Sequence, residues 1–509
     1  MFQTCRLWNL SIASVLALTL SNVFLTVRLL HSGDCNQPHG AGGGGGAGTG
    51  EDGVSMVVPR APLLTPATCL EYVLAESQAN GTDKAVFSGL DLRLGRWDAR
   101  RLYKIFDYAV VGERFPELSA GYTVCLATQS SLEKIYSLVQ VAHHWSGPIS
   151  AAIFAAGNDE LYLLQLYLSY LRLCFRPIRE RVSFHLVLPR DRAATHLRSV
   201  HVADFTRLDC AKPEATLNEL LQRRTPDTSK WRIKNPYPQN HLRNVARKGC
   251  QCGYVFLTDV DIVPSVSFAE QLDKFLRQRG VMAGAGTGAA SNNQLHQHHH
   301  YAHQPLTAFV VPTYELDERV RFPRNKTDLI RLANKGLARP FHHKVFIYNQ
   351  FATNFSRWQA DVAAESDETK VSHNVTNFEF LYEPFYVAPD TVPPHDERFL
   401  GYGYTRNTQV YEMFVAGYQF QVLTPLFTVH WGLQNKKSRP AWRERQNNVN
   451  RKYFEVFKRE VFARYHKDPL RMLLPKKAQK QQAQQAGAAG GGAGGGIVAI
   501  GAAGAPGKP

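Results

Sequence analysis

The sequence lacks the short motifs that mark several common classes of nucleotide-binding and metal-binding proteins. No strand-to-helix junction carries a phosphate-binding P-loop or a G-x-G-x-x-G fingerprint, which argues against nucleotide hydrolysis and dinucleotide binding. The 8 cysteines form no C-x-x-C pair, and Cys250 and Cys252 have a spacing unsuited to a zinc knuckle. A structural zinc site is therefore not expected, whereas disulfides would form in an oxidising compartment.

Residues 7–27 contain no charged side chain. A helix of this length, at about 1.5 Å per residue, spans roughly the 30 Å hydrocarbon core of a bilayer. We expect a transmembrane signal anchor here, with residues 1–6 as a short cytoplasmic tail and the body of the protein following the membrane helix. A cleaved signal peptide is the alternative interpretation.

Several segments have too few large apolar side chains to form a core. Residues 28–66 include the run GAGGGGGAGTG and are expected to form a flexible stem. The low-complexity segment 471–509 is expected to be a disordered tail. Residues 284–304 are an insertion with five histidines, which we interpret as a polar surface loop rather than a metal site. The predicted globular domain covers residues 67–470.

The formal net charge of +16 arises mainly near the C-terminus. Residues 436–480 contain fifteen Lys or Arg and four acidic residues. Within this segment apolar residues recur at helical spacing, at Phe454, Phe457, Val461 and Tyr465. We interpret the segment as a helix that packs through this apolar stripe and exposes a basic face. Nucleic acid is not an expected partner, although the basic face could help to hold an anionic glycan.

Four Asn-x-Ser/Thr sequons follow the predicted membrane helix, at Asn80, Asn325, Asn354 and Asn374. Such tripeptides accept glycans on the lumenal side of secretory membranes. The sequons therefore favour a lumenal location for the body of the protein.

The globular segment alternates between strand and helix patterns. Residues 122–131, 148–156 and 182–189 read as buried strands, and residues 132–145 and 160–174 read as helices. This alternation predicts an α/β fold with a mainly parallel sheet, whose ligands bind at the carboxyl ends of its strands.

The segment YVFLTDVDIVPS, residues 254–265, carries two aspartates at the end of an apolar strand. Burying Asp259 and Asp261 uncompensated would be costly, so a basic neighbour, a hydrogen-bonding loop or a divalent cation must neutralise them. The preceding helical segment, residues 237–249, carries polar side chains on neighbouring turns at Asn240, Arg243 and Asn244. In the simplest alternative to a metal site, Arg243 pairs with the aspartates.

Seven stretches, in the same order along the chain, resemble glycosyltransferase family 49, the beta-1,4-glucuronyltransferases, and the related glucuronyltransferase domain of LARGE. The resemblance runs from about Thr123 to Tyr465 and implies a GT-A fold, with a Rossmann-like nucleotide-sugar core. Its stretches are HHWSGPISAAIF, YPQNHLRNVARKG, VFLTDVDIVPS, FVVPTYEL, TNFSRW, EPFYVAPDTVPPHDERFLGYGYTRN and VAGYQFQVL to VHWG.

The resemblance also implies a site for Mn²⁺ and a UDP-sugar. Asp261 is expected to bind the metal directly, with Asp259 on the metal or the ribose, and His430 in FTVHWG matches the third ligand of the family. The residues expected to bind the donor are Thr128, Ser130, Asn240, Arg243, Asn244 and Asp259.

Transfer with inversion requires a carboxylate that takes the proton from the acceptor hydroxyl. The segment PPHDERFLGYGY has glycine and aromatic residues suited to a turn beside an acceptor cleft. We predict Asp396 as the catalytic base, with Glu397 as the second choice. The alternative is that either acid only pairs with Arg398.

The resemblance implies an inverting, Mn²⁺-dependent transferase that is a single-pass type II protein of the Golgi membrane. Its expected substrates are UDP-glucuronate and a β-linked xylose that terminates an O-mannosyl glycan of the dystroglycan type. Two alternatives stay open: a transferase that uses UDP-N-acetylglucosamine or UDP-xylose, and a non-catalytic lumenal glycan-binding protein.

Overall fold

The computed structural model describes residues 86–205, 208–285, 306–361, 368–435 and 440–473, all within the compact unit Thr68–Pro509. The predictions for other residues lie outside this description: the cytoplasmic tail, the membrane anchor, the stem, Asn80, and most of the 284–304 insertion and the 471–509 tail. Within the described ranges, no helix is long and apolar enough to cross a membrane.

The strands form two sheets, and the larger has ten strands in the order β1-β2-β5-β4-β3-β6-β12-β8-β13-β11. Its strands are β1 (Arg96–Trp97), β2 (Tyr103–Val110), β3 (Val124–Ser131), β4 (Ile149–Phe154), β5 (Val182–Pro189), β6 (Tyr254–Leu257), β8 (Thr307–Val311), β11 (Lys370–Asn374), β12 (Phe385–Pro389) and β13 (Gln419–Thr424). The smaller sheet contains β10 (Ala338–Pro340), β9 (Thr313–Leu316), β14 (Thr428–Trp431) and β7 (Ile262–Pro264).

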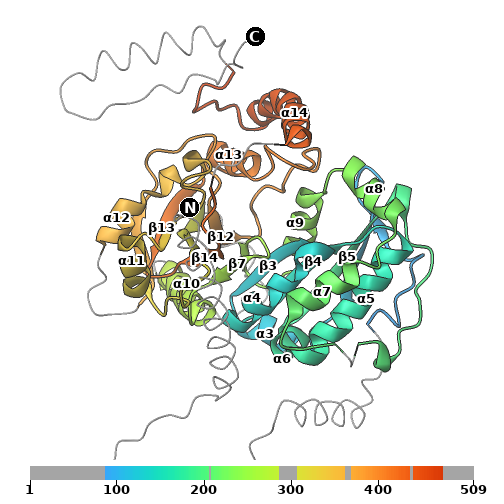
Figure 1. Ribbon diagram of the computed structural model, residues 1–509. Helices are drawn as coiled ribbons and strands as arrows, with labels where there is room; N and C mark the ends of the chain where they lie inside the picture. The colour runs from blue at the N-terminus through green and yellow to red at the C-terminus, as the bar shows by residue number, and fades with distance from the viewer. Residues whose placement is uncertain (1–85, 206–207, 286–305, 362–367, 436–439, 474–509) are drawn as a thin grey trace, which may run out of the picture. The chain divides into compact units, whose positions relative to one another are not determined.

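The helices cover both faces of the larger sheet and extend beyond it (Figure 1). They are α3 (Phe115–Gly121), α4 (Leu138–His144), α5 (Gly157–Cys174), α6 (Arg176–Arg181), α7 (Pro213–Leu221), α8 (Pro226–Lys234), α9 (Gln239–Lys248), α10 (Phe268–Ala285), α11 (Lys326–Asn334), α12 (Phe355–Ala360), α13 (Asn407–Ala416) and α14 (Ala441–Tyr465). A 3₁₀ segment, Leu132–Ser137, replaces the first part of the helix predicted over residues 132–145.

The α/β class is confirmed, but the expectation of a mainly parallel sheet is correct only for its central strands and for the pair β8 and β13. Strands β5, β4, β3 and β6 are parallel neighbours. Strand β12 is antiparallel to both β6 and β8, and antiparallel pairs also involve β1, β2 and β11. The sheet is therefore mixed.

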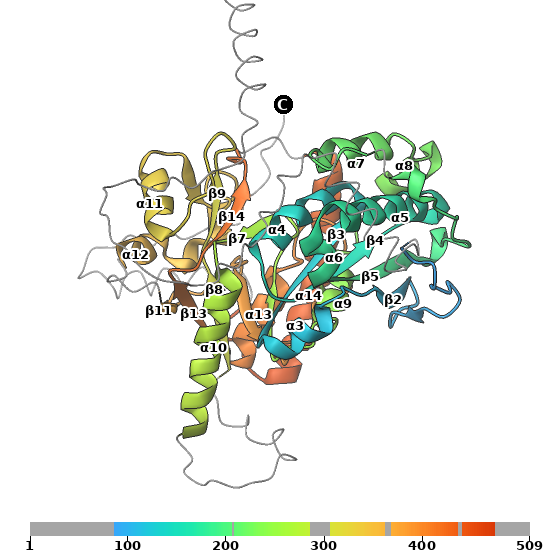
Figure 2. The ribbon, with the colours of Figure 1, turned by 90° about the horizontal axis from the view of Figure 1, so that it is seen from below.

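Alternating residues of the central strands face two different helical layers. Leu126 of β3 and Ala151 of β4 belong to the large core that α4 and α5 cover, while Ala127 belongs to a second core with Leu242 and Val245 of α9. Figure 2 shows α4 and α5 over one face of β3, β4 and β5. Because both faces are covered, nearly every residue of β3, β4 and β5 is buried, including polar residues such as Ser150 and His185.

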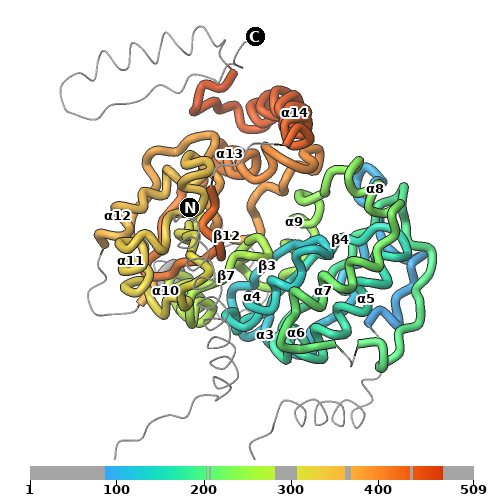
Figure 3. The backbone as a smooth tube through the Cα atoms, in the orientation of Figure 1, coloured from blue at the N-terminus to red at the C-terminus, as the bar shows by residue number. Residues whose placement is uncertain are grey.

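The C-terminal helix packs as its apolar stripe predicts. Phe454, Phe457 and Val461 of α14 are buried against residues of α13, and Tyr465 contacts the same cluster. The tube in Figure 3 shows α14 beside α13, at one end of the described chain. This packing fixes the turn that leads into α13, which borders the site described below.

Two disulfides connect segments that are distant in sequence. Cys125 of β3 pairs with Cys250, which follows α9, and Cys174 pairs with Cys210. The first disulfide ties the loop that leads into β6 to the neighbouring strand β3. It therefore helps to fix the approach to the two aspartates.

Candidate active site

The two aspartates lie in a turn where the chain passes from the large sheet to the small one. The main-chain N–H of Thr258 still donates to Ala127 of β3, and the N–H of Ile262 donates to the carbonyl of Asp259, which closes the turn. Strand β7 then pairs with β14, with Ile262 opposite His430. The segment 254–265 thus contains two strands of different sheets, and the aspartates follow the first strand, as the sequence predicts.

Asp261 lies beside His430, as the family resemblance implies for a metal site. The distance from Oδ2 of Asp261 to Nε2 of His430 is 3.7 Å, and both side chains are partly exposed. A carboxylate oxygen and an imidazole nitrogen at this spacing suit a divalent cation, whose other positions water and diphosphate oxygens would fill. These residues therefore fit the expected metal.

Asp259 has different partners, because two arginines hold its carboxylate. Oδ1 lies 2.8 Å from Nη2 of Arg406 and 3.3 Å from Nη2 of Arg243. Burial alone would raise the pKa of Asp259, but Arg406 and Arg243 outweigh it and lower the pKa to about 2. Asp259 is therefore ionised at neutral pH without a metal.

Helix α9 supplies three of the predicted donor-binding residues, and two of them contact the chain near residue 396. Nδ2 of Asn240 donates to the carbonyl of Asp396 at 2.9 Å, and Nδ2 of Asn244 donates to the carbonyl of His395 at 2.8 Å. Arg243 instead reaches Asp259. In this conformation, Asn240 and Asn244 position the 395–397 segment beside α9.

The other predicted donor-binding residues, Thr128 and Ser130, lie at the carboxyl end of β3 and are buried. Among the described residues, Oγ1 of Thr128 has no hydrogen-bond partner, while the hydroxyl of Ser130 donates to the carbonyl of Ser131. The intervening Gln129 accepts a hydrogen bond from Tyr237 and contributes to stabilising ionised Asp259. This strand end thus adjoins the aspartate turn.

The two predicted catalytic acids have partners of their own. The carboxylate of Asp396 accepts from Nε of Arg398 at 3.0 Å, and Arg398 also pairs with Glu460 of α14. Asp396 therefore makes the pairing with Arg398 that is the alternative to a catalytic role. Glu397 does not pair with Arg398 but accepts from Nδ2 of Asn244 at 3.0 Å.

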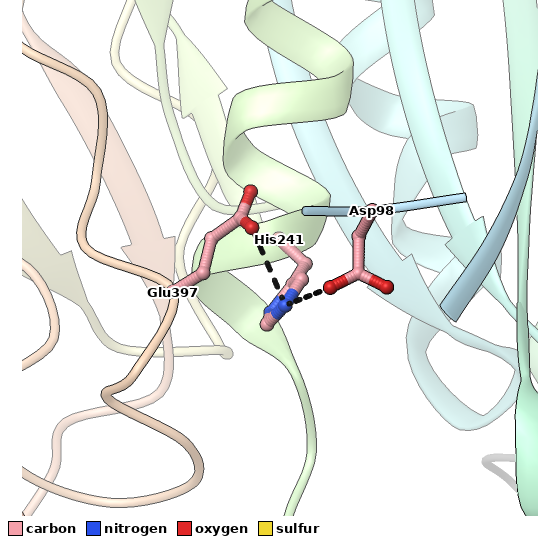
Figure 4. Close-up of side chains that lie close together, drawn as sticks. All are labelled: Asp98, His241 and Glu397. Atoms are coloured by element: carbon pink, nitrogen blue, oxygen red, sulfur yellow. Dashed lines mark ion pairs between the residues drawn. The ribbon is translucent and has the colours of Figure 1, made fainter. Parts of the chain in front are cut away.

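Glu397 also belongs to a compact cluster with His241 and Asp98, shown in Figure 4. Nε2 of His241 lies 3.4 Å from Glu397 and 3.6 Å from Asp98. One ligand-type atom from each residue lies within 4.8 Å of the others. Burial lowers the pKa of His241, and the two carboxylates oppose this shift. The cluster joins α9, the loop before β2 and the 395–397 segment.

A cleft of about 910 Å³ is lined by His342 and Glu383, both of which interact electrostatically with Asp259, although neither aspartate lines the cleft itself. Its aromatic lining comes from Tyr237, Phe346, Tyr402, Tyr404 and Trp442, and its polar lining includes Arg232, Gln239, His342, Asn349, Glu383, Asn407, Arg443, Gln446 and Asn447. Neither Asp396 nor Glu397 lines it. Apolar rings with a few polar groups between them are typical of sites for small organic ligands.

The turn Gly401–Tyr404 forms one wall of the cleft, as its glycine and aromatic pattern predicts. Gly401 and Gly403 have φ values of 68° and 88°, a region that favours glycine. A Cβ on either glycine would also overlap Gln446 or Asn447 of α14. The amide of Asn450 donates to the carbonyls of Leu400, Tyr402 and Gly403, which fastens the turn to α14.

Sequence reasoning did not identify three further residues around the aspartates: Arg406, His342 and Glu383. Arg406 lies over the ring of Phe385 at 4.3 Å and reaches Asp259. Burial and the neighbouring His430 lower the pKa of His342 to about 4, so its imidazole is neutral at pH 7. Glu383 lines the cleft, and burial raises its pKa. Arg406 and Glu383 lie in the EPFYV…GYGYTRN stretch that supported the resemblance.

Buried Glu315 of β9 holds the loops around His430. Oε1 accepts from the N–H of His342 at 2.9 Å, and Oε2 accepts from the N–H of Gln434 at 3.0 Å. Nε of Arg339 pairs with the same carboxylate at 2.8 Å. Glu315 therefore links the loop of His342 to the segment that follows His430.

These features define a class of protein. Strand-end carboxylates and a histidine suit a cation that binds a diphosphate, and the adjoining cleft suits a second organic substrate. The combination is that of an enzyme that transfers a group from a nucleotide-linked donor.

Comparison with known proteins identifies the particular family. Residues 123–466 match the family described as glycosyl-transferase for dystroglycan, and the chain belongs to this family. Beta-1,4-glucuronyltransferase 1 from Homo sapiens is 32% identical over 349 residues, which cover 68% of this chain and 77% of the relative. The Danio rerio protein of the same name is 28% identical, over 74% and 83% of the two chains.

A more distant relative is xylosyl- and glucuronyltransferase LARGE2 from Mus musculus. It is 25% identical over 68% of this chain and 39% of the relative. The family resemblance inferred from the sequence is thereby confirmed, and the chain is a UDP-sugar glycosyltransferase.

The geometry predicts that Asp261→Asn abolishes sugar transfer and leaves the fold near normal. The substitution removes the charge that a cation needs but keeps the shape of the side chain. Initial rates should fall to a few per cent of wild type or less, even in excess divalent cation, while the thermal melting curve changes little. Glu117→Gln, which removes an exposed carboxylate in α3, is the matched control. Substantial transfer by Asp261→Asn would exclude Asp261 as a ligand.

Proposed function

We propose that the protein transfers glucuronic acid from UDP-glucuronate, with inversion, to a β-linked xylose that terminates an O-mannosyl glycan of the dystroglycan type. The observation that carries the proposal is the 32% identity to beta-1,4-glucuronyltransferase 1, together with the family match over residues 123–466, which include the aspartate turn and the cleft. The family description, glycosyl-transferase for dystroglycan, supports the acceptor class.

In this proposal the core is of the GT-A type and the cation is Mn²⁺, held by Asp261 and His430. When bound, Mn²⁺ neutralises the charge that develops on the leaving UDP. Asp259 remains on the donor side of the site, paired with Arg243 and Arg406. Thr128 and Ser130 border the donor from the end of β3, and Asn240 and Asn244 keep the 395–397 segment in place.

The cleft is the proposed acceptor site. Flat aromatic rings such as Tyr402 and Trp442 offer faces for the C–H surface of a sugar, while side-chain amides such as Gln446 and Asn447 offer partners for its hydroxyls. Arg443, which lies over the rings of Tyr402 and Trp442, adds positive charge at the same wall. These aromatic faces and polar side chains suit a bound glycan better than they suit a bound peptide helix.

A donor panel tests the proposed reaction. The full-length protein, purified in detergent with Mn²⁺, should transfer glucuronic acid to an acceptor with a β-linked terminal xylose. UDP-N-acetylglucosamine and UDP-xylose should give at most trace product, and an acceptor that ends in mannose is the control. Mass spectrometry and NMR of the product identify the sugar and its linkage. Efficient transfer from either of the other donors would overturn the donor assignment.

We further propose that the protein is a single-pass type II protein of the Golgi membrane, anchored by residues 7–27, with its catalytic domain in the lumen. Asn325, Asn354 and Asn374 are exposed, as acceptors of glycans must be. Asn325 and Asn354 cap α11 and α12 through Oδ1, so that Nδ2 can carry a glycan. The two disulfides suit an oxidising lumen.

The topology predicts the outcome of two treatments of protein made in secretory cells. N-glycosidase should lower the apparent mass, because the exposed sequons carry glycans. A C-terminal epitope should resist protease in intact Golgi vesicles and be digested once detergent opens them. An unshifted band together with an epitope digested in intact vesicles would reverse the orientation.

A further inference from the structure

Inverting transfer needs a base at the acceptor hydroxyl, and the two acids predicted from the sequence both face other partners. Of the described residues that line the cleft, Glu383 alone carries a carboxyl group. We propose that Glu383 is the general base that takes the proton from the acceptor hydroxyl. This inference rests on the proposed function, whose cleft it assigns to the acceptor.

Strand pairing places Glu383 near the aspartate turn. Glu383 precedes β12, which is antiparallel to β6 with Tyr386 opposite Leu257. Because the strands run in opposite directions, the residues before Phe385 lie alongside those that follow Leu257, where Asp259 is found. Glu383 thus stands between the proposed donor site and the acceptor cleft.

Hydrogen bonds hold Glu383 in this position. Its main-chain N–H donates to the carbonyl of Asn349 at 2.8 Å, and its carbonyl accepts from Nε2 of Gln350 at 2.9 Å. Nδ2 of Asn349 donates to Oε2 of Glu383 at 3.1 Å, which orients the carboxylate. Asn349 itself lines the cleft. A base fixed in this way can meet a bound hydroxyl without reorganisation.

The surroundings of Glu383 also suit proton transfer. Burial raises the pKa of Glu383, the nearby Asp259 adds to the rise, and Arg406 and Arg243 limit it. A carboxylate that is more basic than usual accepts a proton more readily, which suits a general base. His342, the other basic group at the cleft, has a pKa of about 4 and accepts protons less readily.

The proposed transfer step forms one bond and breaks another. The acceptor hydroxyl oxygen forms a bond to the anomeric carbon, and the bond from that carbon to the diphosphate oxygen breaks. The electron pair of the broken bond leaves with UDP, while the hydroxyl proton passes to the carboxylate of Glu383. Solvent removes this proton after the product leaves.

Glu383→Gln tests the assignment in the full-length enzyme. The turnover number should fall by about 10²-fold or more, the range for losing a general base, while calorimetric binding of UDP with Mn²⁺ stays within about threefold of wild type. Glu383→Asp keeps the negative charge but moves the carboxylate back by one methylene group, so it should give an intermediate rate. Glu412→Gln is the matched control: Glu412 is a buried carboxyl in α13 whose pKa burial also raises, but it contacts Arg464 and Tyr465 instead of the cleft.

The pH profile separates a base from a structural residue. The wild-type turnover number should decrease on the acidic side, as pH falls through the raised pKa of Glu383, because the protonated carboxyl cannot accept the hydroxyl proton. This acidic limb should disappear in Glu383→Gln. Formate added to Glu383→Ala should restore part of the rate, because it supplies a carboxylate in the space left by the side chain.

Two results would overturn the assignment. One is a rate of Glu383→Gln within a few-fold of wild type. The other is loss of the acidic limb in Asp396→Asn or Glu397→Gln while Glu383→Gln keeps it. The donor assignment can fail independently of the base assignment. A wild-type enzyme that transfers another sugar refutes the donor assignment, and the Glu383 variants then test the base with that sugar.

Discussion

The neutralisation of two carboxylates at the end of a buried strand is the constraint on which the site depends. Strand β6 is covered on both faces and ends just before Asp259 and Asp261, where unpaired negative charges would be costly. The negative charges of the two aspartates are compensated by different partners. Arg243 and Arg406 hold Asp259, whereas Asp261 lies beside His430 and remains partly exposed.

Each of these partners depends on a more distant part of the fold. Arg243 comes from α9, whose asparagines also hold the 395–397 segment. Arg406 follows the glycine-rich turn that Asn450 fastens to α14. His430 reaches Asp261 because β7 and β14 pair in the small sheet, and Glu315 holds the loops around it. The C-terminal helix therefore shapes the site although it supplies no ligand for the cation.

Sequence reasoning succeeded where local patterns decide the structure. The strand at 182–189 and the apolar stripe of α14 follow from periodicity, and the place of His430 beside Asp261 follows from the family motif. The C-terminal half of the sheet could not be predicted in this way. Strand β12 inserts between β6 and β8 through pairings that no local pattern encodes.

The same limit applies to the acids of the site. Asp396 and Glu397 lie in a conspicuous motif, but packing turns them toward Arg398 and His241. Glu383 directly precedes Pro384 and an apolar strand, and the pairing of β12 with β6 brings it near Asp259. Arg406 reaches Asp259 through a long-range contact for the same reason. The sequence therefore indicates which residue types the site needs, whereas the fold determines which way each side chain points.

The central claim is that the two aspartates have separate roles, with Asp261 at the cation and Asp259 at the arginines. Electron paramagnetic resonance of Mn²⁺ in the presence of UDP measures cation binding without turnover. We expect Asp261→Asn to abolish detectable binding, and Asp259→Asn to weaken it by about 10- to 100-fold, as for a residue outside the ligand shell. Equal loss of binding in the two variants would contradict the account.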